Sequence, residues 1–196
     1  GKKGKGEGGV YADNFNIIAG KNNINYGTLH ATSAGGNTDQ FAIDMSEYGG
    51  MYANKIYLIS TNDGVGVNTD GAIYALENLT IQSNGKIINN NIVWSNNDII
   101  VQGKDDVENH NLLYAQGNIN IATDGALINE TGKIKSENNI SIDANQIQTD
   151  GIIYAGLAQS GDMGEHGTLT MRVDSDITMA GQVSAAEDIA INTQGV

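Results

Sequence analysis

The sequence predicts an all-β chain folded as a right-handed parallel β-helix, a solenoid built from coils of about 20 residues. Three observations predict this fold. A pattern of apolar residues recurs with every coil, the apolar residues within a coil are spaced by two, and the 196-residue chain contains no proline. Spacing by two is typical of strands. Proline lacks the N–H group that a central strand donates to its neighbour, so a chain made almost wholly of central strands excludes it.

The repeat begins at Gly71. Two later segments, 151–156 and 168–171, form one unit that is split by an insertion of about ten residues. One such unit cannot bury its apolar face alone, whereas stacked units bury a continuous core between them. The sequence therefore predicts coils stacked one on another. The other units align without a gap: 71–81, 91–101, 111–121, 132–142 and 181–191.

Each unit has the same order of apolar positions. An apolar residue stands at the third position and a small residue two places later, as in Ile73 and Ala75. A pair spaced by two follows, as in Leu79 and Ile81, and Ile87 closes the unit. An Asn or Asp precedes the paired strand, where its side chain suits a corner that recurs in every coil because it bonds neighbouring amides. These corner residues are Asn78, Asp98, Asn118, Asn139 and Asp188.

The pattern weakens towards the N-terminus, which divides the chain into parts. Residues 1–9 carry no core residue and are expected to be a flexible leader. Residues 10–48 are expected to form irregular β-helix coils, and 49–196 the regular shaft repeats. The insertion at 157–166 is expected to protrude as a loop or hairpin. No polar cap is visible before Val196, so we expect the chain to be a piece of a longer rod.

The charge narrows the choice of partners. The formal net charge is −13, and three of the ten basic side chains fall within the first five residues. A surface this acidic repels a phosphate backbone or an anionic leaflet, so neither nucleic acid nor a membrane is an expected partner. No apolar run approaches the length of a membrane span. The chain has no cysteine, so disulfides and thiolate chemistry are excluded.

Aromatic residues occupy the fourth position of the unit, which points outward because its neighbours at three and five point inward. We expect this aromatic rib mainly to stack down the sheet for stability. The alternative is that it contacts a ligand such as a sugar ring. The rib residues named as candidate ligand contacts are Tyr74, Trp94, Tyr114 and Tyr154.

The insertion supplies a second group of candidate contacts, Asp162, Glu165 and His166. His30 and His110 are far from it in the repeat frame, so no histidine pair converges and no metal site is expected. Basic side chains are too sparse to face a cluster of acidic ones, as cleavage of a polysaccharide would require. Neither an enzyme nor a cofactor is therefore expected.

Residues 44–75 read DMSEYGGMYANKIYLISTNDGVGVNTDGAIYA. This stretch resembles the segment that opens the shaft repeats of filamentous-haemagglutinin-like two-partner-secretion exoproteins. Residues 151–191 are similar to the same family, with Ala155-Gly156 followed by a glycine-rich insertion and then by GTLTM and AGQVSAAEDIAI. In the first stretch the matching residues are Asp44, Ser46, Gly49, Gly50, Met51, Tyr52, Ala53, Lys55, Ile56, Leu58, Thr61, Gly64, Val65, Gly66 and Val67.

The resemblance implies a function. Members of this family include adhesins and contact-dependent growth-inhibition toxins, which leave Gram-negative bacteria through a dedicated outer-membrane β-barrel transporter. It implies a secreted or cell-surface shaft that presents a distal adhesive or toxin-delivery region. The alternative is an adhesin module that itself binds a receptor or glycan on a host or target cell, through the rib or the insertion. The family's secretion domain, with its Asn-Pro motifs, is missing, so residues 10–48 are a candidate junction to it.

Overall fold

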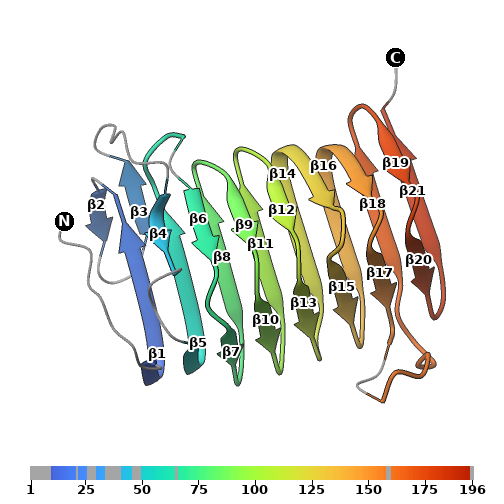
Figure 1. Cartoon of the computed structure of the whole chain (residues 1–196), viewed down its shortest axis with the longest axis horizontal. Coiled ribbons are helices and arrows are strands. Elements are labelled where there is room, and N and C mark those ends of the chain that lie inside the picture. The colour runs from blue at the N-terminus through green and yellow to red at the C-terminus, as the bar shows by residue number, and fades with distance from the viewer. Residues whose placement is uncertain are drawn as a thin grey trace.

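A computed structural model describes residues 10–20, 22–25, 30–33, 41–45, 50–64, 66–157 and 160–194. In this part of the chain, one 19-stranded sheet winds into about seven coils of roughly 21 residues. Its strands all pair in parallel, and successive coils lie side by side along the long axis of Figure 1. The prediction of a parallel β-helix is confirmed. The expected leader, residues 1–9, lies outside the described residues.

The regular coils contribute strands to three columns. The first column holds β7 (Ile73–Ala75), β10 (Ile92–Ser95), β13 (Leu112–Ala115), β15 (Lys133–Ser136), β17 (Ile152–Ala155) and β20 (Gln182–Ala185). The second holds β8 (Leu79–Ser83), β11 (Ile99–Gly103), β18 (Leu169–Val173) and β21 (Ile189–Thr193). The third holds β4 (Phe41–Asp44), β6 (Gly66–Thr69), β9 (Ile87–Asn89), β12 (Val107–Asn109) and β19 (Ile177–Met179).

Four longer strands pass through a corner and belong to two columns each. They are β1 (Val10–Ala19), β5 (Met51–Ser60), β14 (Ile119–Asn129) and β16 (Ile140–Thr149). In β5 the corner is one residue short: Ala53 pairs with Ala75 and Ile56 with Leu79, so three steps of β5 face four steps of the next coil. The shorter corner lets β5 continue as a single strand. A separate antiparallel pair, β2 (Asn22–Asn25) and β3 (His30–Ser33), lies near the N-terminal end.

The pairing register confirms the alignment of the repeats. Val93 pairs with Ile73 on one side and Leu113 on the other. The register also holds across the insertion, because Ile140 pairs with Leu169 and Ile153 with Val183. The corner residues behave as the sequence predicted. The side-chain oxygens of Asn78, Asp98, Asn118 and Asn139 accept backbone N–H groups of the next coil, as from Asn118 to Asp98 Oδ1 (2.7 Å) and from Thr168 to Asn139 Oδ1 (2.9 Å).

Inward side chains form one apolar core that runs through the coils. A slip of one residue in any strand would turn its whole apolar set outward, so the core fixes the register. The small residue at the fifth position of each unit, such as Ala115 or Ser136, is also buried and leaves room for its larger neighbours. Fully buried members include Ile56, Leu58, Ile73, Leu79, Val93, Ile99, Ile119, Leu127, Ile134, Ile147, Ile153, Leu169 and Met171.

A polar ladder runs inside this core along the third column and continues on β14 and β16. The Thr69 hydroxyl donates to Asn89 Oδ1 (2.9 Å), and Asn89 Nδ2 donates to Asn109 Oδ1 (2.8 Å). Asn109 Nδ2 donates to Asn129 Oδ1 (2.8 Å), and Asn129 Nδ2 to the Thr149 hydroxyl (3.0 Å). All five residues are at most 3% exposed. Each amide thus finds its partner one coil away.

The same amides satisfy backbone carbonyls at the turn that leads into the next coil. Asn89 Nδ2 also donates to the Leu112 carbonyl (3.2 Å), and Asn109 Nδ2 to the Asn111 carbonyl (3.2 Å). The turn is closed tightly over the ladder, because a Cβ on Gly132 would lie 2.3 Å from Asn109 Nδ2. The buried ladder therefore closes the corner between the third column and the first.

Replacing Asn109 by Leu should destabilise the fold much more than replacing the exposed Asn120 by Leu. The first change leaves the Asn89 amide and Asn129 Oδ1 without their ladder partner inside the core. A buried polar group that loses its partner costs about 1–3 kcal/mol, so the free energy of unfolding should fall by roughly 2–5 kcal/mol. Chemical denaturation of both variants measures the difference. Equal losses would contradict a stabilising role for the ladder.

Candidate functional site

The aromatic rib stacks as the register requires. The ring centroids of Tyr11 and Tyr52 are 5.0 Å apart, and those of Tyr52 and Tyr74 are 5.1 Å apart, with interplanar angles of 9° and 7°. Trp94 and Tyr114 approach to 4.1 Å at 25°. These separations are close to the spacing of neighbouring strands, about 4.8 Å. Tyr11, Tyr52, Tyr74, Trp94 and Tyr114 therefore each turn at least one ring face towards another ring of the rib.

Tyr114 differs from the expectation of an exposed contact residue. It lies on the outer face, yet only 5% of its surface is exposed, because Trp94 stacks on its ring. Its hydroxyl donates to Glu137 Oε1 at 2.5 Å. Burial, and then the hydrogen bond to Glu137, raise the pKa of Tyr114 above its ordinary range. The alternation of the strand predicted that this side chain points outward, but it did not predict that Trp94 covers the ring.

Towards the C-terminus the rib is no longer wholly aromatic. Lys135 takes the position next to Tyr114, and its Nζ lies 5.9 Å from the Tyr154 ring centroid. Tyr154 is half-buried, and its hydroxyl donates to Gln182 Oε1 in the next coil at 2.6 Å. On its other side Tyr154 pairs with Ser184, which is too small to cover the ring. Tyr154 thus closes the rib beside the insertion.

The insertion leaves the coil directly after β17, where Figure 1 shows it projecting from the lower edge of the rod, near the C-terminal coils. Leu157 is buried and forms an isolated antiparallel bridge with Met163, and the Gly164 N–H donates to the Gly156 carbonyl at 2.6 Å. Residues 160–166 are exposed. The insertion is therefore a protruding loop whose base is fixed by backbone hydrogen bonds.

The three candidate contacts on the insertion do not converge. His166 Nδ1 lies 3.0 Å from Glu187 Oε1 of the next coil, and this hydrogen bond is the main cause of the lowered pKa of Glu187. Asp162 Oδ2 accepts the Ser160 hydroxyl at 3.2 Å, and Glu165 is exposed. Among the described residues no group of three His, Cys, Asp or Glu side chains could hold a metal ion. The His30 side chain lies outside that part.

A small ion cluster on the third column was not predicted. Lys86 Nζ lies 2.5 Å from Glu108 Oε1 and 3.5 Å from Asp106 Oδ2, and His110 Nε2 lies 3.2 Å from Glu108 Oε2. Burial acts to raise the pKa of Glu108, but its hydrogen bonds with Lys86 and His110 outweigh that effect and lower it. Lys86 comes from one coil, and Asp106, Glu108 and His110 come from the next coil at positions spaced by two. Partly exposed pairs of this kind contribute little to stability.

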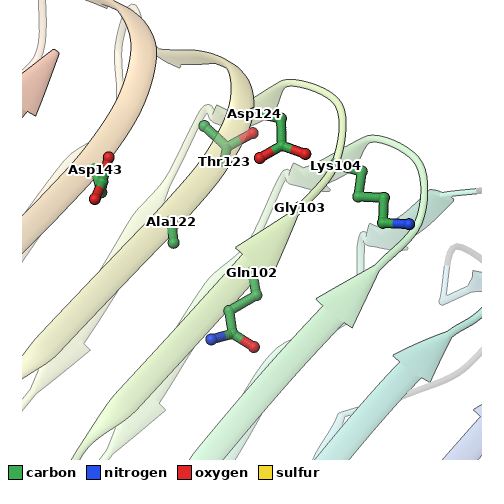
Figure 2. Close-up of a pocket in the computed structure, with 7 residues that line it drawn as sticks. All are labelled: Gln102, Gly103, Lys104, Ala122, Thr123, Asp124 and Asp143. Carbon is green, nitrogen blue, oxygen red and sulfur yellow. The ribbon is translucent and has the colours of Figure 1, made fainter. Parts of the chain in front are cut away.

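A shallow groove of about 420 Å³ crosses the outer face of the second column. Figure 2 shows Ala122 between Gln102 and Asp143, with Lys104 and Asp124 at the turns. The groove exists because Ala122 is much smaller than its partners in the column, Gln102 and Asp143. Five of its seven lining residues have polar or charged side chains, with charges of both signs, and the groove is open to solvent.

The chain is similar to segments of much longer proteins. It is 45% identical over 82 residues, 40% of the chain, to "tRNA nuclease CdiA-2" of Burkholderia pseudomallei. It is 29% identical over 195 residues, 95% of the chain, to "tRNA nuclease CdiA" of Yersinia mollaretii. It is 26% identical over 193 residues, 94% of the chain, to "16S rRNA endonuclease CdiA" of Enterobacter cloacae. The matched segments span 3%, 6% and 5% of these relatives.

No family model and no solved structure matches the chain. Within the described residues, no helical segment of membrane-crossing length and apolarity occurs.

Deleting residues 157–166 should leave the fold intact. A Cβ on Gly167 would lie 2.4 Å from Gly156 Cα, so the two α-carbons lie within about 4 Å, near the 3.8 Å of a peptide link. Joining them closes the coil without changing the apolar register. We expect β-type circular dichroism and a melting temperature within a few degrees of the parent. Deleting 147–156, which removes core strands instead, should abolish folding. Loss of folding in the first variant would contradict this account of the loop.

Replacing Trp94 and Tyr114 together by Ser should destabilise the fold by about 3 kcal/mol, because the pair loses its stacking and its buried area. Tyr11→Ser, at a position that is 77% exposed, should cost much less. Thermal melts compare the two. If the rib were a recognition surface instead, the parent chain would bind cells or a glycan array, and the double variant would lose that binding at temperatures where it is folded.

Proposed function

Since the chain is a homologue of the CdiA proteins, secreted or cell-surface exoproteins of contact-dependent growth inhibition in Gram-negative bacteria, we propose that it is a segment of their shaft. In this role it holds a distal toxin-delivery region away from the producing cell. The observation that supports this proposal most strongly is the pairing register, which is unbroken from β7 to β21. The apolar core and the polar ladder also continue from one coil to the next. A solenoid of this kind is rigid along its axis because each coil is fixed by both neighbours.

The nuclease activities in the relatives' names belong, in this proposal, to other parts of those proteins. The same segment matches one relative named for tRNA and another named for 16S rRNA, and it spans 6% and 5% of them. A segment common to proteins with different named substrates fits a shared carrier function better than it fits either activity. The acidic charge of −13 also disfavours binding of RNA.

Two partners follow from the proposal at the level of the whole protein. One is the outer-membrane transporter that exports the parent chain, and the other is a receptor on the target cell. The stacked rib supports a carrier role for this segment over a receptor-binding role, because the rings of Tyr11, Tyr52, Tyr74, Trp94 and Tyr114 each have at least one face covered by another ring. The division at residues 48 and 49, between junction and regular shaft, remains part of this proposal.

Removing one whole coil from the full-length parent should preserve function. Deleting residues 91–110 places Ile73 against Leu113 and Asn89 against Asn129, so the core and the ladder are restored. The shaft should shorten by one strand spacing, about 4.8 Å. We expect normal surface levels and normal inhibition of target cells in co-culture.

The matched control deletes residues 91–105, which shifts the apolar register and leaves buried positions with polar residues. This variant should be degraded or retained in the cell. If the whole-coil deletion reached the surface at normal levels and yet failed to inhibit target cells, the segment would have a specific role beyond that of a spacer.

A further inference from the structure

Two lysines on β15, Lys133 and Lys135, lie on the outer face of the rod without an acidic partner. Both project outward, since Ile134 and Ser136 between and after them are buried. Among the described residues, the ion pairs of lysine involve Lys55 and Lys86 and neither member of this pair. Glu137, the acidic residue that follows on the same strand end, accepts the Tyr114 hydroxyl instead. In a chain of net charge −13 this is an unusual local excess of positive charge.

Placing the two lysines side by side is electrostatically unfavourable. Lys135 is half-buried, and its burial together with the neighbouring charge of Lys133 lowers its pKa. Two like charges separated by two strand residues, about 6.6 Å, repel each other. A bound anion would remove this repulsion, since one acidic group is within reach of both flexible side chains.

Apolar side chains surround the lysine pair on the same face. Leu112 and Ile152 flank Lys133 in the neighbouring coils, while Tyr114 and Tyr154 flank Lys135. Leu112, Ile152 and Tyr154 are partly exposed and present apolar surface to solvent. The result is a flat apolar patch with two positive charges at its centre. A ligand that fits it is flat, has an apolar face and carries a negative charge.

We propose that this patch, formed by Lys133, Lys135, Leu112, Ile152 and Tyr154, binds an acidic sugar unit, a pyranose that bears a carboxylate. The carboxylate lies between the two ammonium groups, and the C–H face of the ring lies against the apolar side chains, which removes both from water. The site goes beyond the shaft function and does not depend on it. It would let the side of the rod adhere to acidic polysaccharide at a cell surface.

Other acidic macromolecules fit the patch less well. Nucleic acid binds through many phosphate contacts, and the rest of this acidic surface would repel a long polyanion. An extended acidic peptide would need an open strand edge, but β13, β15 and β17 are paired on both sides. A rigid sugar ring needs only the flat face and loses little conformational freedom on binding.

Titration of the chain with a trimer of galacturonic acid tests the proposal, with its neutral methyl ester as the matched ligand. We expect measurable binding of the acid and at least tenfold weaker binding of the ester. Lys133→Gln combined with Lys135→Gln should weaken binding of the acid at least about tenfold, as expected for loss of charged hydrogen bonds. The melting temperature should not fall, because the variant loses a repulsion.

The control variant combines Lys104→Gln, at the turn after β11, with Arg172→Gln on β18. It changes the net charge equally, away from the patch, and should leave binding unchanged. Equal weakening by both variants would overturn the proposal, as would equal affinity for the ester or no binding of the acid at millimolar concentration. A single-stranded oligonucleotide or a glutamate-rich peptide of matched charge that bound as tightly would overturn it too. None of these outcomes bears on the shaft, which the whole-coil deletion tests separately.

Discussion

Pairing with the next coil is the constraint on which the rest of the structure depends. Each strand leaves its N–H and C=O groups to be satisfied by the coil above and the coil below, so every coil must repeat the same path at nearly the same length. The internal ladder applies this rule to side chains. Asn89, Asn109 and Asn129 each bond to a side chain one coil away, and these bonds form only when the coils are in register. Variation is therefore confined to outward positions and corners.

The insertion after β17 is an example of variation that is confined to a corner. It adds residues at a corner, where the chain already turns towards solvent, and Gly156 and Gly167 bring its two ends together. Both glycines have positive φ, 79° and 144°, and a side chain on either would collide with backbone of the other or of His166. The coil beneath the insertion thus keeps its register. The rib and the lysine pair show the same freedom on the outer face, where aromatic, basic and polar residues share one column.

The apolar repeat was sufficient to predict the fold, the register and the alignment across the insertion. The internal ladder was missed, although Thr69, Asn89, Asn109, Asn129 and Thr149 are spaced by 20. An inward Asn looks like an outward one in the sequence, and only the bonds between coils show that it is buried. The burial of Tyr114 was missed for a related reason, because alternation gives the direction of a side chain and not what covers it. Outward ion pairs such as Lys86 with Glu108 depend on side-chain reach, which the repeat does not encode.

The rise of one strand spacing for each coil has a mechanical consequence. A coil of roughly 21 residues adds about 4.8 Å to the folded rod, but the same residues span at most about 70 Å when pulled straight. A coil inside the rod is held by two neighbours, and a coil at an open end by one. Under tension between two cells the rod should therefore unwind from a free end, one coil at a time. Each released coil would supply more than ten times its folded length and limit the force that reaches the rest of the protein.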